Sequence, residues 1–195
     1  TNWSTRKDAT ASYSENCNKI AATPPVITAT GNQIYCTGSS LKIIPSVNIT
    51  FDPLEPETDV MYVQISSGYV SGSDLLSLAN PAFHQSKNIF PNWDAATGKL
   101  KLFSPTGTKI LYTDFVAALK DVIFSNSETA PSGARTFSIT IDQANYLPST
   151  QHYYEYVSSP GISWTDAKLA AEGRNYYGLK GYLATILAAD EAQLT

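Results

Sequence analysis

Charged side chains are scarce in this chain. Only 15% of its 195 residues are charged, against about 25% in a typical soluble domain. The net charge is −4, and the basic surplus that nucleic-acid binding requires is absent, so that class of function is excluded. No run of apolar residues approaches the roughly 18 needed to cross a bilayer, so the sequence is not expected to span a membrane.

Histidine is nearly absent, and the common catalytic motifs are missing. His84 and His152 stand alone, without the paired spacing of a catalytic zinc site. No serine lies in a Gly-x-Ser-x-Gly turn, and there is no Gly-x-Gly-x-x-Gly or Gly-Lys-Ser/Thr loop for a phosphate. The sequence therefore predicts a protein that is not an enzyme.

Cysteine is limited to Cys17 and Cys36. In a secreted protein these two can form a disulfide that closes a loop of about 20 residues and stabilises by roughly 3 kcal/mol. The alternative is a pair of free thiols. The sequence begins at Thr1 with a polar stretch, so we expect that any signal peptide has already been removed. Residues 1–26 are expected to form an extended N-terminal arm that ends at Pro24 and Pro25.

Short alternating segments dominate the middle of the chain. Apolar and polar residues alternate in 47–51, 61–65, 100–102 and 137–141, which is typical of half-buried strands. Residues 113–120 have Thr113 as a candidate N-cap and Asp114 in the first turn, so they predict a short helix. We therefore expect residues 27–150 to form a mainly β domain, a β-sandwich with one short helix.

The middle segment resembles a known family of repeats. The successive pieces Asp74-Leu-Leu-Ser-Leu, Trp93-Asp-Ala-Ala-Thr-Gly, Tyr112-Thr-Asp-Phe-Val and Arg135-Thr-Phe-Ser-Ile-Thr-Ile are similar to the cadherin-like repeats of bacterial surface proteins. Such repeats have an immunoglobulin-like sandwich fold and often bind calcium. The resemblance implies a weak calcium site with Asp52, Asp59 and Asp142 as candidate ligands. The alternative is that residues 52–59 form a solvated acidic loop.

The last 45 residues resemble the start of a C-type lectin-like domain. His152-Tyr-Tyr-Glu-Tyr-Val, Gly161-Ile-Ser-Trp-Thr-Asp-Ala and Gly181-Tyr-Leu-Ala-Thr-Ile follow one another in the order of that family. Residues 151–195 are therefore expected to be the N-terminal, α+β part of such a domain, with a helix capped at Ser163 and a strand over 182–186. The resemblance places four residues in the core of the lectin fold: Tyr154, Trp164, Leu183 and Ile186. The family's sugar-ligand motifs do not occur in this sequence, so no sugar-binding residue is assigned.

Together, the two resemblances suggest a large cell-surface adhesin. The layout is similar to that of surface proteins of gliding Bacteroidetes that leave the cell by type 9 secretion. It implies a secreted or cell-surface location, a polysaccharide or cell-surface glycan as partner, and contact with the type 9 translocon or outer-membrane components. One alternative is an accessory binding region of a secreted carbohydrate-active enzyme. Another is a structural stalk or passenger that the secretion machinery binds.

Overall fold

The computed structural model is mainly β, as the sequence predicts. It describes residues 23–142, 144–147, 150, 152–157, 159–177 and 179–187. These residues divide into two compact units. The larger unit holds residues 25–162 and 184–187, and the smaller holds 163–183 and 23–24. The predicted N-terminal arm lies mostly outside the described residues.

The larger unit is built on a four-stranded antiparallel sheet in the order β11-β5-β8-β7. The strands are β5 (Val60–Ser67), β7 (Phe90–Asp94), β8 (Lys99–Phe103) and β11 (Thr136–Ile141). Alternate side chains of β5 and β8 are buried: Met61, Val63, Ile65, Leu100 and Leu102. The strands predicted from alternation over 61–65, 100–102 and 137–141 are thus confirmed.

Shorter strands complete the sandwich. One group has the order β2-β10-β6, formed by β2 (Leu41–Lys42), β6 (Asp74–Leu78) and β10 (Val122–Asn126). A two-stranded ribbon pairs β1 (Val26–Thr30) with β3 (Ser46–Thr50), and a second pairs β4 (Glu57–Thr58) with β9 (Ile110–Leu111). Leu76, Val122, Phe124 and Ile49 join the side chains of the four-stranded sheet in one apolar core.

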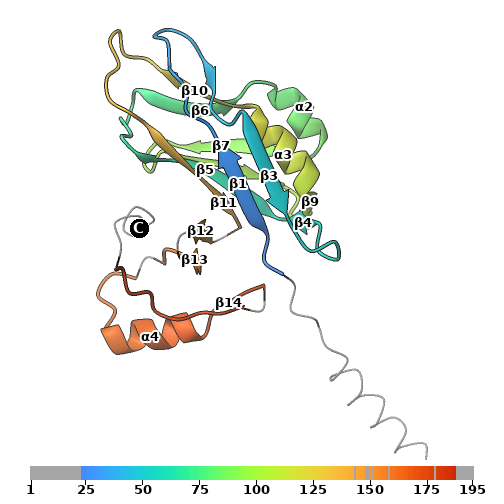
Figure 1. Ribbon diagram of the computed structural model, residues 1–195, viewed down its shortest axis with the longest axis vertical. Helices are drawn as coiled ribbons and strands as arrows, with labels where there is room; N and C mark the ends of the chain where they lie inside the picture. The colour runs from blue at the N-terminus through green and yellow to red at the C-terminus, as the bar shows by residue number, and fades with distance from the viewer. Residues whose placement is uncertain are drawn as a thin grey trace, which may run out of the picture. The chain divides into compact units, whose positions relative to one another are not determined.

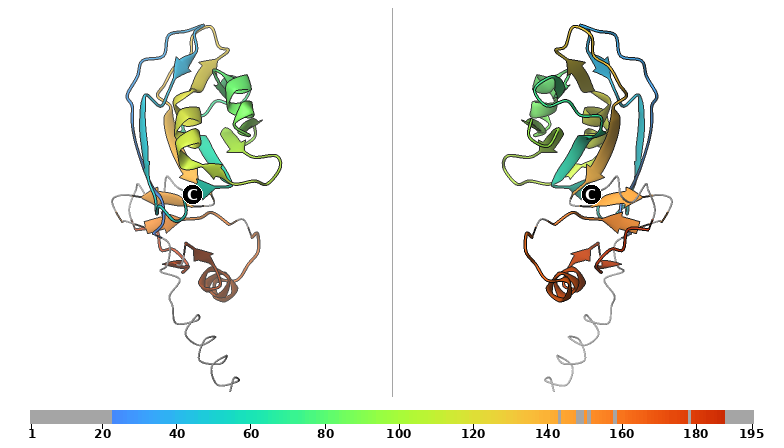
Figure 2. Two further views of the ribbon diagram at one scale, coloured as in Figure 1. Left: turned by 90° about the vertical axis from the view of Figure 1, so that its right-hand side faces the viewer. Right: turned by 90° about the vertical axis from the view of Figure 1, so that its left-hand side faces the viewer.

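Two helices accompany these strands in the described part of the unit, where the sequence analysis predicted one. The predicted helix is α3 (Tyr112–Lys120), but its N-cap is Leu111, so Thr113 lies within the helix. Helix α2 (Pro81–Ser86) was not predicted. Figure 1 shows α3 behind the β1–β3 ribbon, and Figure 2 shows α3 between that ribbon and α2. The inner face of α3 is therefore enclosed, and Phe115 and Leu119 are fully buried there.

The β7–β8 hairpin shows how a turn residue shapes the sandwich. Asp94 accepts hydrogen bonds from the Ala96 N–H at 2.9 Å and the Thr97 hydroxyl at 2.7 Å. The bond from Thr97, followed by that from Ala96, lowers the pKa of Asp94. Gly98 has φ of +64°, and a Cβ there would come within 2.9 Å of the Tyr69 ring. The turn thus needs glycine, and Asp94 caps it through hydrogen bonds to residues two and three positions further on.

The chain enters and leaves the sandwich at neighbouring points. Strands β12 (Asn145–Leu147) and β13 (His152–Tyr154) form a hairpin after β11. The Tyr153 hydroxyl donates a hydrogen bond of 3.2 Å to the Pro25 carbonyl, one residue before β1. The segment that enters the sandwich and the hairpin that follows its last strand therefore touch.

The smaller unit contains helix α4 (Trp164–Glu172) and the pair β14 (Asn175–Tyr176) and β15 (Leu179–Lys180). The Ser163 hydroxyl accepts a 3.1 Å hydrogen bond from the Asp166 N–H, so the predicted cap is confirmed. No residue of α4 is buried. Residues 182–186 have no regular secondary structure. The predicted strand is wrong because alternation alone does not form a strand without a neighbour to pair with.

Among the described residues, no helix has the length and apolar character needed to cross a membrane.

Candidate functional site

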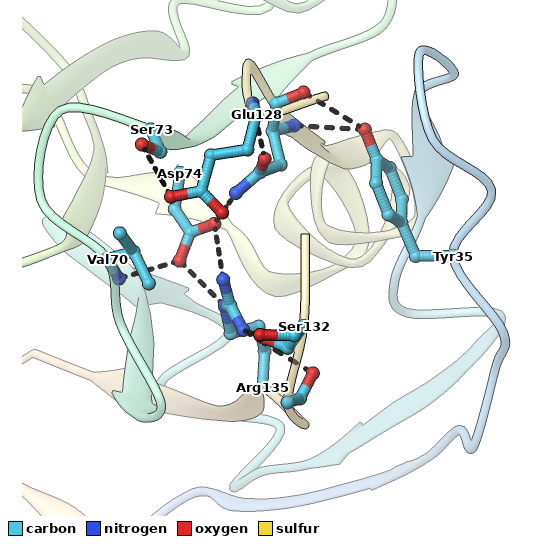
Figure 3. A network of polar contacts seen from close by, with 9 residues as sticks. Tyr35, Val70, Ser73, Asp74, Glu128, Ser132 and Arg135 are labelled. Carbon is cyan, nitrogen blue, oxygen red and sulfur yellow. Dashed lines mark hydrogen bonds and ion pairs between the residues drawn. The ribbon is translucent and has the colours of Figure 1, made fainter. Parts of the chain in front are cut away.

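A fully buried carboxylate lies at the start of β6. Arg135 donates to Asp74 from Nε at 2.8 Å and from Nη2 at 3.2 Å, a bidentate ion pair shown in Figure 3. Asn126 Nδ2 and the Val70 N–H donate at 2.6 Å and 2.8 Å. Burial would raise the pKa of Asp74, but these hydrogen bonds and the charge of Arg135 hold it below its usual value. Because both of its oxygens are occupied, Asp74 is suited to holding structure rather than to accepting a proton.

The same network reaches a loop far away in the sequence. The Tyr35 hydroxyl accepts a hydrogen bond from the Asn126 N–H at 3.1 Å and lies 3.3 Å from the Asn126 carbonyl, to which it can donate (Figure 3). The Glu128 N–H donates to Asn126 Oδ1 at 2.7 Å, and Ser73 Oγ donates to Glu128 at 3.2 Å. The network thus ties together the loops beside β2, β6, β10 and β11. No local sequence pattern marks it, because Asp74 and Arg135 are 61 residues apart.

An open concavity of about 370 Å³ lies beside this network. Trp93 and Leu75 supply its apolar surface, and Ser73, Ser125 and Ser127 supply hydroxyl groups. Trp93 is held edge-on against Tyr69, with ring centroids 6.1 Å apart. The combination of an aromatic wall and small hydroxyls can accommodate a small amphipathic group. These residues were not among those predicted from the sequence.

A second polar cluster is centred on Asp121, between α3 and β10. Its carboxylate accepts hydrogen bonds from Lys42 Nζ at 2.6 Å, from His84 Nε2 at 2.9 Å and from Asn80 Nδ2 at 3.1 Å. The Lys42 hydrogen bond is the largest influence, and together these donors lower the pKa of Asp121 to about 2. The His84 side chain is only 1% exposed, so this bond serves a buried imidazole. The cluster joins β2 and α2 to the turn between α3 and β10.

Asp121 is expected to make the sandwich sensitive to acid below pH 4. Its folded pKa of about 2 lies below the usual 3.8, so the stabilisation is complete above about pH 4 and is lost as the pH falls through 2. After allowance for solvent screening, we expect about 1–2 kcal/mol to be lost. The free energy of unfolding is measured by urea unfolding between pH 2 and pH 6. In Asp121→Asn it should not show the loss that protonation of Asp121 causes in the wild type. In Lys42→Met this loss should be smaller than in the wild type. Identical pH profiles for wild type and Asp121→Asn would contradict this role.

The three candidate calcium ligands do not all come together. Asp52 serves its own loop, because its Oδ1 accepts a 3.0 Å hydrogen bond from the Leu54 N–H. Asp142 is half-buried at the end of β11, and its pKa is raised first by burial and then by the charges of Asp59 and Glu155. The Asp142 N–H donates a 3.0 Å hydrogen bond to the Val60 carbonyl, so Asp142 lies beside the segment that carries Asp59. Glu155 is a third carboxylate that acts on Asp142 and was not predicted from the sequence.

This arrangement has only part of what a calcium site requires. Calcium takes six to eight oxygen ligands, typically from several carboxylates and carbonyls. Within the described residues, no group of three or more His, Cys, Asp or Glu side chains is arranged to hold a metal. Lys109 also lies close enough to lower the pKa of Asp142, against the effect of its acidic neighbours. Calcium binding stays a prediction.

The four residues assigned to the lectin core are partly or largely exposed. Tyr154 is half-buried, and its hydroxyl donates to Thr150 Oγ1 at 3.2 Å. Leu183 is half-buried, Ile186 is 41% exposed and Trp164 is 69% exposed. Their place in a lectin core stays a prediction, as does the boundary at residue 151.

The predicted disulfide also stays a prediction. Cys36 is exposed, in the loop that carries Tyr35. Cys17 lies outside the described residues.

These observations define a class before any relative is considered: a mainly β sandwich whose buried polar networks are engaged in holding loops together. Among curated proteins, the chain is similar to halomucin of Haloquadratum walsbyi, with 29% identity over 174 residues. The match covers 86% of this chain and 2% of halomucin, so the chain spans about 2% of its relative's length. No family model matches the sequence, and no solved structure matches it.

Proposed function

We propose that this chain is a segment of a large, surface-associated, non-enzymatic protein. The observation that carries the proposal is the similarity to halomucin, which extends over most of this chain and over a very small part of the relative. A small segment that is similar along almost its whole length fits a module within a long polypeptide. The polar networks agree with this role, because Asp74 and Asp121 are occupied by structural partners.

The geometry of the sandwich supports display rather than simple extension of a stalk. The Pro25 carbonyl and the Tyr153 hydroxyl are hydrogen-bonded, so the chain arrives and departs at the same end of this unit. A module that is connected in this way projects sideways from the path of the polypeptide. It would present its other end to the surroundings, where Figure 1 shows β6 and β10 lying away from β12 and β13.

We further propose that the partner is a polysaccharide or cell-surface glycan, bound through a lectin-like module that begins near residue 151. The order of aromatic and small residues in that segment supports this proposal. Calcium binding by the sandwich is a separate proposal, with Asp59 and Asp142, two of the three predicted ligands, as its candidate residues. The assignments to gliding Bacteroidetes and to type 9 secretion depend on the sequence resemblance alone.

The test combines location with binding. The complete protein should be found in the surface fraction of the cells that make it, and should be retained on polysaccharide in the presence of calcium. Calcium binding is measured separately by titration calorimetry, in which Asp142→Asn is expected to weaken the affinity about tenfold or more, which corresponds to about 1.4 kcal/mol. Asp94→Asn serves as the matched control, because Asp94 caps an exposed hairpin away from Asp142. Absence from the surface fraction would reject the surface role, and failure to bind any polysaccharide would reject the glycan partner.

A further inference from the structure

Strand β3 contains the tripeptide Asn48-Ile49-Thr50. An asparagine followed two residues later by threonine, with no proline between them, is the acceptor pattern for N-linked glycans. Side chains alternate along a strand, so Asn48 and Thr50 lie on the same face. Both are exposed, whereas Ile49 is buried in the core. The strand thus presents both recognition residues of the pattern to solvent.

The face around Asn48 is suited to carrying a bulky polar group. In the β1–β3 ribbon, Thr28 lies opposite Asn48, and Thr30 lies opposite Ser46. All four side chains are exposed, and neither strand contains a charged residue. Figure 1 shows the ribbon on the outside of the sandwich, with α3 behind it. A saccharide on Asn48 would therefore extend into solvent without disturbing the core.

The Asn48 amide also differs from other asparagine amides of the sandwich. Asn80, Asn88 and Asn126 each donate from Nδ2 to a side-chain oxygen of the protein. Within the described part of the chain, no hydrogen bond to another residue involves the Asn48 side chain. Its nitrogen is not needed to hold the fold, and a substituent there breaks no contact.

We propose that Asn48 is an N-glycosylation site. In the reaction, Asn48 Nδ2 forms a bond to the anomeric carbon of a saccharide that is activated as a phosphate-linked lipid. The bond between that carbon and the phosphate oxygen breaks, the phosphate leaves with the electron pair, and the amide nitrogen gives up one proton to a base of the transferase. The inference goes beyond the proposed surface role, although it shares with that role the need for export.

The structure also indicates when the transfer would occur. Every residue of β3 is paired with β1 in the folded ribbon, with Asn48 opposite Thr28. A transferase that must bend the acceptor segment cannot do so while this segment is paired in the ribbon. We therefore expect glycan transfer to precede formation of the ribbon, and the exposure of Asn48 then lets the modified chain fold.

The experiment is mass spectrometry of the full-length protein from the cells that make it. Trypsin should release one peptide from Ile43 to Lys87 that contains Asn48, and this peptide is expected to carry a saccharide mass. Asn48→Gln and Thr50→Val should remove that mass completely, whereas Thr50→Ser should keep it because the hydroxyl remains. Thr28→Val is the matched control on the same face and should have no effect.

The outcomes separate this inference from the surface role. The peptide is examined in whichever cell fraction holds the protein. An unmodified peptide, or a saccharide mass that persists in Asn48→Gln, would overturn the inference even if the protein is on the surface. Circular dichroism and thermal melting of the unglycosylated variants should match the wild type, since both substituted positions are exposed. Loss of the mass in a variant that still folds is the result that supports Asn48.

Discussion

Replacing Phe115 with alanine is expected to lower the free energy of unfolding of the sandwich by about 3–5 kcal/mol. The Phe115 side chain is completely buried on the inner face of α3, next to Tyr112, Ala118 and Leu119, which are buried on the same helix. Truncation removes its apolar contacts and leaves a cavity, because neighbouring strands are too well packed to collapse into it. A loss of this size is a large part of the 5–15 kcal/mol that typically stabilises a domain.

The free energy of unfolding of Phe115→Ala is measured by urea unfolding, and Phe83→Ala is the control. Phe83 has the same side chain and also lies in a helix, α2, but is 56% exposed. We expect Phe83→Ala to cost less than about 1 kcal/mol, since little apolar surface is returned to water there. Equal losses for the two variants would mean that α3 does not complete the core of the sandwich.

Strands with clear alternation were the part of the fold that could be predicted from sequence. Residues 61–65 and 100–102 carry their signal locally, because buried and exposed side chains alternate along one strand. Helix α3 was predicted from local signals, of which Asp114 does lie in the first turn, whereas Thr113 lies within the helix and does not cap it. The structure confirms these elements as β5, β8 and α3.

Elements that depend on tertiary surroundings escaped prediction. Helix α2 has six residues, too few to show a helical period, and only Asn80-Pro81 marks its beginning. Residues 182–186 alternate as a strand does, yet they remain without regular structure in this chain. A local pattern reports neither the tertiary contacts that α2 makes nor the missing strand partner of residues 182–186.

The polar clusters were the least predictable part of the candidate site. Asp74 accepts a hydrogen bond from the nearby Val70 N–H, but its partners Asn126 and Arg135 come from distant segments. Asp52, Asp59 and Asp142 were selected together, whereas the structure places Asp59 and Glu155 beside Asp142. The sequence suggested which carboxylates are candidate site residues, whereas the fold determined which of them lie close together.

Replacing Arg135 with methionine is expected to destabilise the sandwich by about 3–5 kcal/mol at neutral pH, because it leaves a buried carboxylate without its charge partner. The Asp74 side chain is 0% exposed and that of Arg135 is 9% exposed, so water cannot replace the lost interaction. Without Arg135, the pKa of Asp74 should rise. Hence the difference from wild type should narrow as the pH falls and Asp74 takes up a proton. Urea unfolding from pH 7 down to pH 3 measures both effects.

Lys87→Met is the matched control, since it removes a cation from an exposed ion pair, 3.7 Å from Asp114, and should cost less than about 1 kcal/mol. The double variant Asp74→Asn, Arg135→Met tests the mechanism further. If the main cost is the unpaired buried charge, removing both charges should destabilise less than the two single changes added together. If the losses of unfolding free energy of the two single variants add up to that of the double variant, Asp74 and Arg135 act independently. The loops that contain Tyr35, Asn126 and Arg135 would then be positioned by packing rather than by this ion pair.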